Sequence, residues 1–332
     1  MNQKKVLLLS IGAVALLAGI LITLLFLGFN QDNSEDQTYT ILSESSQPKS
    51  VQVTNQDGVF TMTENGENAS GETNWIINEF PDVPLSNTYC QQLANMTQNL
   101  SATKLFDAQE DLSSYGLDQP QATVVAEFDK NSVTISIGDQ NPSMTGYYCQ
   151  VSDNPQIALV SNANVAPFLR GSYGYVDRTL IPYTSTDNEE SASSQVQSCT
   201  ITRSDLPEPV TAQRGEDGNL QITSPEGYSM DAETQTLMEN APFSLAAKNT
   251  VSVYPTQEQL TSFGLTEPQA TVSYEIAGTS YTLQIGNSAS TSQNAGDDST
   301  STTYYVMLEG RPVVYTLANT SLPWLTMSFT QN

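Results

Sequence analysis

Apolar and polar residues alternate along much of the chain, as they do in strands with one buried face. The first alternating segment, KSVQVTNQDGVFTMTEN (49–65), is interrupted by Asp57-Gly58, a dipeptide typical of hairpin turns. A different period, in steps of three and four, predicts an amphipathic helix with Ser86 as its N-cap, through Leu85, Tyr89, Leu93, Met96 and Leu100. Alternating strands with few helices indicate an α+β fold.

The pattern is written twice. SSYGLDQPQATV (113–124) returns as TSFGLTEPQATV (261–272), and the strand-like segments VTISIGD and YTLQIGN follow at the same interval. We predict two tandem β-rich repeats, each an antiparallel sheet with one longer and one short helix. The expected boundaries are 39–183 for the first repeat, 184–195 for a polar linker and 196–332 for the second repeat.

Each copy of the repeated phrase has the pattern of a helix stop followed by a strand. Asp107–Glu110 and Thr256–Gln259 have the spacing of a capping box, which predicts a short helix. After it, a glycine takes a left-handed backbone, a leucine folds back on the last turn, and a proline prevents the helix from resuming. The residues expected in these structural roles are Leu112, Gly116, Leu117 and Pro120, then Leu260, Gly264, Leu265 and Pro268.

The N-terminal segment is apolar. Residues 6–29 carry no charge, and Lys4 and Lys5 precede them. At about 1.5 Å per residue such a segment crosses the hydrocarbon core of a bilayer. We expect a transmembrane signal anchor at residues 1–30, with the N-terminus cytoplasmic and the bulk of the protein outside the cell membrane. A cleaved signal peptide is the alternative.

The charge balance and the lack of histidine limit which partners and activities we expect. The net charge is −25 and there is no histidine. An acidic surface repels phosphate backbones, so we expect no nucleic-acid partner. Without histidine there is no Ser-His-Asp or Cys-His arrangement, and we expect no enzyme activity, no cofactor and no metal site. The cysteines lack metal or redox spacing; inert thiols are expected and a Cys90–Cys149 disulfide is the alternative.

The repeated motifs resemble those of a bacterial family, the domain of unknown function DUF4340. The resemblance lies in LSSYGLDQPQATV, VTISIGD and GYYCQV, and in their counterparts LTSFGLTEPQATV, YTLQIGN and TYYVML. It is specific for the helix stop and the strands that follow, and it indicates two tandem copies. The resemblance implies an extracytoplasmic companion of ABC-type transporter systems.

Two functions are therefore expected. The first is a membrane-anchored, non-enzymatic accessory or scaffold component of an ABC-type transporter or cell-envelope complex. The second is an extracytoplasmic module that binds peptide, glycan or cell-wall material in a groove between the repeats. The candidate contacts for the second are paired tyrosines, Tyr147, Tyr148, Tyr304 and Tyr305.

Overall fold

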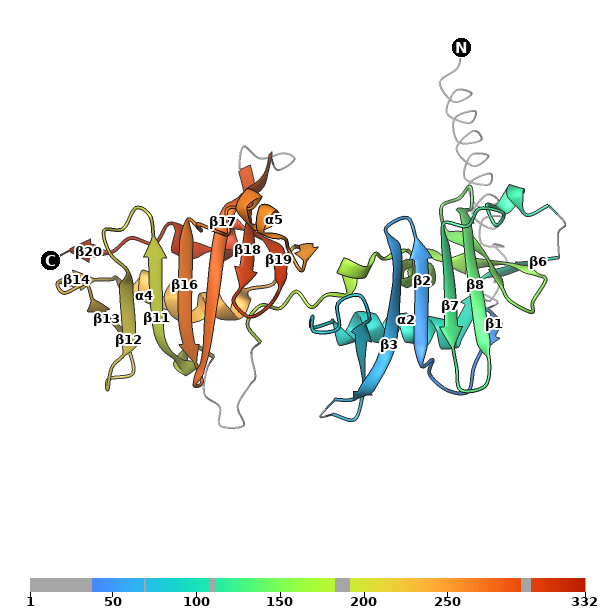
Figure 1. Cartoon of the computed structure of the whole chain (residues 1–332), viewed down its shortest axis with the longest axis horizontal. Coiled ribbons are helices and arrows are strands. Elements are labelled where there is room, and N and C mark those ends of the chain that lie inside the picture. The colour runs from blue at the N-terminus through green and yellow to red at the C-terminus, as the bar shows by residue number, and fades with distance from the viewer. Residues whose placement is uncertain (1–37, 69, 108–110, 183–191, 294–299, 332) are drawn as a thin grey trace, which may run out of the picture.

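The computed structural model describes residues 38–68, 70–107, 111–182, 192–293 and 300–331, which form two lobes side by side (Figure 1). We call residues 38–175 the first lobe, residues 192–331 the second lobe, and residues 176–181 the strap. No helix in the described ranges is long and apolar enough to cross a bilayer. The predicted anchor at residues 1–30 lies outside them.

The first lobe is built on an eight-stranded antiparallel sheet. In spatial order its strands are β4 (Thr73–Ile77), β3 (Gly58–Glu67), β2 (Ser50–Asn55), β7 (Ala122–Glu127), β8 (Ser132–Gln140), β9 (Gly146–Val151), β10 (Ile157–Ser161) and β6 (Lys104–Phe106). A separate two-stranded sheet joins β1 (Tyr39–Ser43) to β5 (Asn99–Ala102). The helices are α2 (Asn87–Gln98), α3 (Asn162–Leu169) and the 3₁₀ helices η1 (Ser113–Tyr115) and η2 (Ser172–Tyr175).

The second lobe repeats this sheet with eight antiparallel strands. Its order is β13 (Leu220–Ser224), β12 (Val210–Arg214), β11 (Val196–Arg203), β16 (Ala270–Ile276), β17 (Thr279–Gln293), β18 (Thr300–Leu308), β19 (Val313–Ala318) and β15 (Asn249–Val253). A small sheet pairs β14 (Tyr228–Ser229) with β20 (Thr330–Gln331). The helices are α4 (Ala232–Asn240), α5 (Gln257–Ser262), η3 (Ala192–Gln195), η4 (Ala241–Ser244), η5 (Asn319–Ser321) and η6 (Pro323–Leu325).

The two sheets have the same strand order, which agrees with the repeat in the sequence. They differ most at the hairpin of β17 and β18, where the second lobe has longer strands than β8 and β9 of the first. The polar insertion in the second copy therefore lengthens a hairpin. Of the expected polar linker, residues 184–191 lie outside the described part, and residues 192–195 form η3.

A layer of helices covers one face of each sheet. Figure 1 shows α2 behind the first sheet and α4 behind the second. The predicted stripe in α2 is correct in part: Leu93 is buried, but Leu85 precedes the helix and Leu100 lies in β5. Ser86 is the N-cap residue, although its side chain makes no capping bond. The helix is shorter than the apolar stripe because the two end residues of the stripe pair with extended segments, Leu85 with Val176 and Leu100 with Leu42.

Both helix stops have the backbone geometry of a Schellman motif. Gly116 and Gly264 have φ values of 67° and 70°, in the left-handed region. Leu117 N–H donates to the Leu112 carbonyl at 3.1 Å, and Leu265 N–H donates to the Leu260 carbonyl at 2.8 Å. The strands β7 and β16 then begin two residues after each proline, at Ala122 and Ala270.

The capping boxes of the two repeats differ in what is described. In α5, Thr256 and Gln259 bond reciprocally through side chain and backbone, as the sequence predicts. In the first lobe, residues 108–110 lie outside the described part, and the described helical segment is the single turn η1.

Each helix stop presses its backbone against a glycine in the neighbouring strand. A methyl group on Gly138 of β8 would overlap the carbonyl oxygen of Tyr115, and one on Gly286 of β17 would overlap that of Phe263. Only an unsubstituted residue permits this approach. The glycine of each "IG" segment is therefore part of the helix stop.

The three cysteines are free and buried. Burial raises the pKa of Cys90 and of Cys199 to about 12 and also raises the pKa of Cys149. Since the thiolate is the reactive form, these thiols are inert at neutral pH.

We expect Gly286→Ala to lower the free energy of unfolding by about 3 kcal/mol, because the new methyl group forces the helix stop off the strand. The matched control is Gly278→Ala, where φ is 76° but no atom lies within 4 Å of the added carbon. This control should lose only about 1 kcal/mol, from backbone strain. Urea denaturation measures both, and equal losses would contradict the role given to Gly286.

We expect none of the cysteines to react with a chromogenic disulfide reagent in the folded protein at neutral pH, and all three to react after unfolding in urea. Unfolded thiols ionise near 9.0, whereas buried Cys90 and Cys199 stay protonated up to about 12. The unfolded state thus binds fewer protons between these values, and the free energy of unfolding decreases as the pH rises through them. Rapid labelling before urea is added would refute this account.

Candidate functional site

The strap ties the two lobes together through backbone hydrogen bonds on both sides. Towards the first lobe, Asp177 N–H donates to the Pro84 carbonyl at 2.9 Å. Towards the second lobe, Ala247 N–H donates to the Arg178 carbonyl at 2.8 Å, and Leu180 N–H donates to the Leu245 carbonyl at 3.1 Å. Because the strap is paired on both sides, the junction has a defined geometry.

Side chains of the second lobe also hold the strap. The Tyr315 hydroxyl donates to the Asp177 carbonyl at 3.0 Å, and Arg311 Nη1 donates to the Thr179 carbonyl at 2.8 Å. Burial raises the pKa of the Tyr315 hydroxyl, so this donor keeps its proton at neutral pH. Arg178 bridges in both directions: Nη1 donates to the Lys248 carbonyl at 2.9 Å and Nη2 to the Tyr89 hydroxyl at 3.2 Å.

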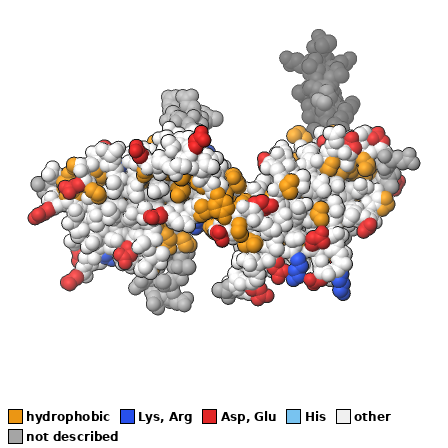
Figure 2. All heavy atoms as spheres, in the orientation of Figure 1, with side chains coloured by type: hydrophobic (Ala, Val, Ile, Leu, Met, Phe, Trp, Pro, Cys, Tyr) orange, Lys and Arg blue, Asp and Glu red, His pale blue; other side chains and the backbone are white. Residues whose placement is uncertain are grey.

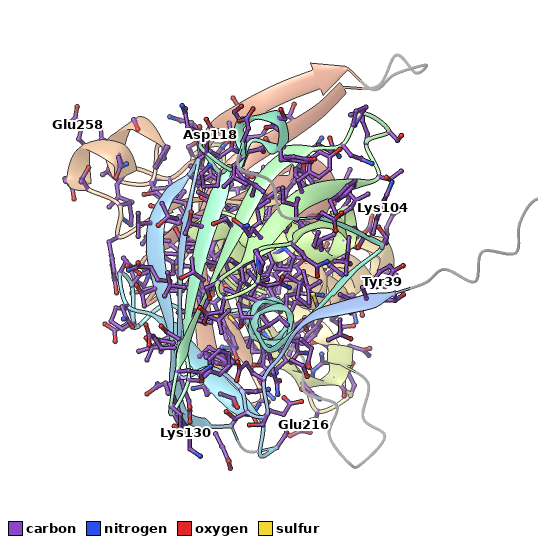
Figure 3. The ribbon with its side chains drawn as sticks, turned by 90° about the vertical axis from the view of Figure 1, so that its right-hand side faces the viewer. Tyr39, Lys104, Asp118, Lys130, Glu216 and Glu258 are labelled. Atoms are coloured by element: carbon purple, nitrogen blue, oxygen red, sulfur yellow. The ribbon has the colours of Figure 1, made fainter. Side chains whose placement is uncertain are left out.

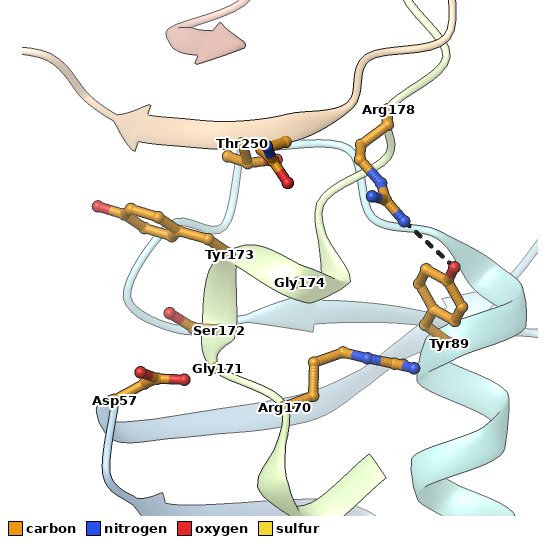
Figure 4. Close-up of a pocket in the computed structure, with 10 residues that line it drawn as sticks. Asp57, Tyr89, Arg170, Gly171, Ser172, Tyr173, Gly174, Arg178 and Thr250 are labelled. Atoms are coloured by element: carbon orange, nitrogen blue, oxygen red, sulfur yellow. Dashed lines mark hydrogen bonds between the residues drawn. The ribbon is translucent and has the colours of Figure 1, made fainter. Parts of the chain in front are cut away.

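A cavity of about 810 Å³ opens at this junction. We call it the junction pocket. Figure 4 shows Arg170 and Arg178 on either side of Tyr89, with Asp57 at the opposite end. Its lining comes from both lobes and the strap: Asp57, Tyr89, Arg170, Gly171, Ser172, Tyr173, Gly174, Arg178, Asn249 and Thr250.

Arg170 is held from several directions. Its guanidinium carbon lies 3.9 Å from the centre of the Tyr89 ring and 5.2 Å from that of Tyr175. These are cation–π distances. The Asn55 side-chain amide donates to the Phe168 carbonyl at 3.2 Å and to the Arg170 carbonyl at 3.1 Å, which fixes the backbone at this position. The charge is therefore held in place by groups that do not neutralise it.

Two glycines make room for this arrangement. A methyl group on Gly174 would collide with the Arg170 side chain, and one on Gly171 would lie 2.6 Å from a carboxylate oxygen of Asp57. The segment LRGSYGYV (169–176) is thus shaped to bring Arg170 and Asp57 to one pocket.

The arginines of the pocket have no carboxylate partner within the described residues. Arg203 and Arg214 each form a salt bridge, with Asp205 at 2.6 Å and Glu239 at 3.2 Å, whereas Arg170 and Arg178 form none. In a chain with 36 acidic and 11 basic residues, two unpaired arginines in one cavity are an unusual concentration of positive charge.

Two buried polar atoms in the lining have no hydrogen-bond partner within the described protein. They are Nη1 of Arg170 and Oγ1 of Thr250. Leaving a buried donor unsatisfied costs about 1 to 3 kcal/mol. An acceptor supplied by a ligand would satisfy such an atom, and the two arginine charges give the pocket the chemistry of an anion site.

The predicted tyrosine contacts do not line this pocket. Tyr148 stacks edge-on against Tyr115, with ring centres 4.9 Å apart, and Tyr305 stacks on Phe263 at 4.5 Å. Tyr147 and Tyr304, on the opposite faces of β9 and β18, pack against the hydrophobic core. The structure thus places the four residues in two separate sheets, where they support the helix stops and the core.

The sequence offers one signal for the junction pocket. APFL (166–169) aligns with LPWL (322–325), but the residues that follow diverge, RGSYGYV in the first copy and TMSFTQN in the second. Arg170 and Gly171 thus stand where the second copy has Thr326 and Met327. A departure from an otherwise repeated pattern marks a position with a role of its own.

No group of three or more histidine, cysteine, aspartate or glutamate side chains that could hold a metal ion comes together within the described ranges.

Arg203, the counterpart of Asn55, donates to the Trp324 carbonyl at 2.7 Å and to the Met327 carbonyl at 3.0 Å. The second lobe therefore uses its arginine at this place as a structural clamp, paired with Asp205.

Comparison with protein families gives one match. The model of the domain of unknown function DUF4340 matches residues 75–254, from β4 of the first lobe to the end of β15 in the second. Neither the curated proteins nor the solved structures contain a significant match to the chain.

We expect Arg178→Met to speed amide hydrogen exchange at Leu180 and Ala247 about tenfold, because hydrogen bonds from a charged donor contribute about 1.5 to 3 kcal/mol. The methionine keeps an apolar stem but loses the bonds to Tyr89 and to Lys248. Lys104→Met is the control, since Lys104 lies at the rim of the first lobe (Figure 3) and stacks on Phe106. Unchanged exchange at both amides in Arg178→Met would show that the arginine does not secure the strap.

Proposed function

Since the chain belongs to the DUF4340 family, a family of unknown function, we propose a function from the features of the chain itself. We propose that it is a membrane-anchored, extracytoplasmic and non-enzymatic protein, an accessory or scaffold component of an ABC-type transporter or cell-envelope complex. The junction of the two lobes is its recognition surface. The observation that carries the proposal is that Arg170 and Arg178 lie in a pocket at that junction and form no salt bridge with any described carboxylate.

The cell-membrane location follows from the N-terminal segment. An uncharged stretch at residues 6–29 after Lys4 and Lys5 favours a retained anchor with the two lobes outside the membrane. Anchoring confines the lobes to the region next to the bilayer, where a transporter partner would also be found.

We further propose that each lobe is one copy of the family domain. The identical strand order of the two sheets and the matching helix stops at Gly116 and Gly264 support this. A rigid pair of such units suits a scaffold, because the paired strap keeps the surfaces of both lobes in one orientation.

A second candidate is a ligand-binding module for peptide, glycan or cell-wall material. The junction pocket favours it, because its volume falls within the range of about 300 to 1,000 Å³ that is usual for ligand sites. In this pocket the aromatic contacts are Tyr89 and Tyr173. Figure 2 shows hydrophobic side chains gathered over the same junction, on a surface that is elsewhere mostly polar.

Photo-crosslinking in native membranes tests the recognition surface. Benzoylphenylalanine at the position of Tyr173, which is 39% exposed and lines the junction pocket, should give adducts with a membrane or envelope protein. The control is the same side chain at Met144, which is 69% exposed in the turn between β8 and β9. Adducts identified by mass spectrometry should be enriched at least several-fold at position 173.

Two outcomes of the crosslinking experiment would contradict the proposal. If the full-length protein gives no adducts at position 173 above those at position 144, the junction is not the recognition surface. If position 173 yields adducts only with soluble cytoplasmic proteins, the extracytoplasmic location is wrong.

A further inference from the structure

We propose that the junction pocket binds the carboxylate group of a small ligand at its arginine side, with the hydrogen-bond donors of the same ligand facing Asp57. This inference rests on the second candidate function, the binding module, and it specifies the chemical class of the ligand. Figure 4 shows the two ends of the pocket that the ligand would span.

The arginine side supplies preformed donors. Nη1 of Arg170 is buried and has no hydrogen-bond partner among the described residues, and the guanidinium carbon lies 3.9 Å from the centre of the Tyr89 ring. Arg178 donates from Nη1 to the Lys248 carbonyl and from Nη2 to the Tyr89 hydroxyl, and it contributes a second positive charge to the pocket. The planar guanidinium matches a carboxylate with two parallel bonds, which a lysine does not do. Because both arginines are already fixed, little side-chain entropy is lost when the ligand binds.

Thr250 extends this donor set from the other lobe. Its hydroxyl is buried, lines the same pocket and has no partner within the described residues. It comes from β15, the edge strand of the second sheet, whereas Arg170 follows α3 of the first lobe. A ligand that satisfies both atoms contacts both lobes.

The opposite end limits the charge of the ligand. Asp57 forms no salt bridge within the described part and contributes a carboxylate to the lining, with Ser172 and Asn249 as further polar neighbours. The chain as a whole carries a net charge of −25. A dianionic phosphate meets repulsion from both, whereas a single carboxylate joined to an ammonium or hydroxyl group finds an acceptor in Asp57. Short peptides and sugar acids share this chemistry.

Isothermal titration of the full-length protein in detergent tests the proposal. The probes are two matched pairs, triglycine with triglycinamide and glucuronate with glucose. Within each pair only the first compound has a carboxylate. We expect at least tenfold tighter binding of a carboxylate form than of its neutral-ended partner. This order opposes the overall acidity of the protein, which favours the more cationic triglycinamide.

Variants locate the site. Arg170→Lys keeps the charge and loses the planar donor pair, and it should weaken binding about tenfold. Thr250→Val keeps the shape of the side chain and should weaken binding several-fold without loss of thermal stability, because its hydroxyl makes no bond within the described protein. Lys104→Gln removes a positive charge outside the pocket and should leave binding unchanged.

Asp57→Asn distinguishes the two ligand sources. For triglycine, whose ammonium group faces Asp57, this variant should weaken binding because the opposite charge is lost. For glucuronate, whose hydroxyl groups still find an acceptor in the asparagine oxygen, it should leave binding nearly unchanged. Selective binding of either acid supports the carboxylate site and identifies its source.

Two results would overturn the inference: equal binding of the acid and neutral forms in both pairs, or equal losses in Lys104→Gln and Arg170→Lys. If crosslinks form at position 173 in membranes while neither acid binds, the carboxylate site is refuted and the recognition surface stands. If an acid binds while no crosslinks form, the binding module stands without the scaffold role.

Discussion

Contact between the backbone of a helix stop and a bare glycine in a strand is the constraint on which each lobe depends. The carbonyl groups of Tyr115 and Phe263 rest on Gly138 and Gly286 at a separation that no other residue allows. This contact fixes where the chain leaves the helix, and so where β7 and β16 begin. Those strands lie at the centre of the two sheets, between β2 and β8 and between β11 and β17. The start of a central strand in each sheet is therefore set by one contact that is made twice.

Much of the fold could be predicted from the sequence by rules that involve only neighbouring residues. The left-handed glycines, the folded-back leucines and the Asp57-Gly58 turn each follow from the conformational preferences of a few neighbouring residues. The duplication then extended these local predictions to a pair of sheets. The end of α2 was not foreseen, because Leu100 pairs with β1, a strand far away in the sequence. The role of Gly138 was missed for the same reason, since its partner Tyr115 belongs to another element.

The candidate site was not predicted from the sequence, because its residues lie outside the motifs that the two copies share. The motifs that the two copies share contain the paired tyrosines, which contact the rings of the helix stops or the core and do not line the junction pocket. Arg170 lies at a position where the copies differ, and the alignment matches it with Thr326 of the second copy. Its importance depends on the second lobe as well as on its own, because the pocket includes Asn249 and Thr250. No periodicity or motif in one repeat encodes a cavity that two repeats enclose together.

The strap also determines how many recognition sites one chain can present. A feature written into the repeat occurs twice in each molecule, as the helix stops do, but two units joined end to end share a single boundary. Duplication thus gives this protein two frameworks and one junction, so a binding function proposed for the junction is monovalent. An assembly that needs several such junctions must recruit one further chain for each of them.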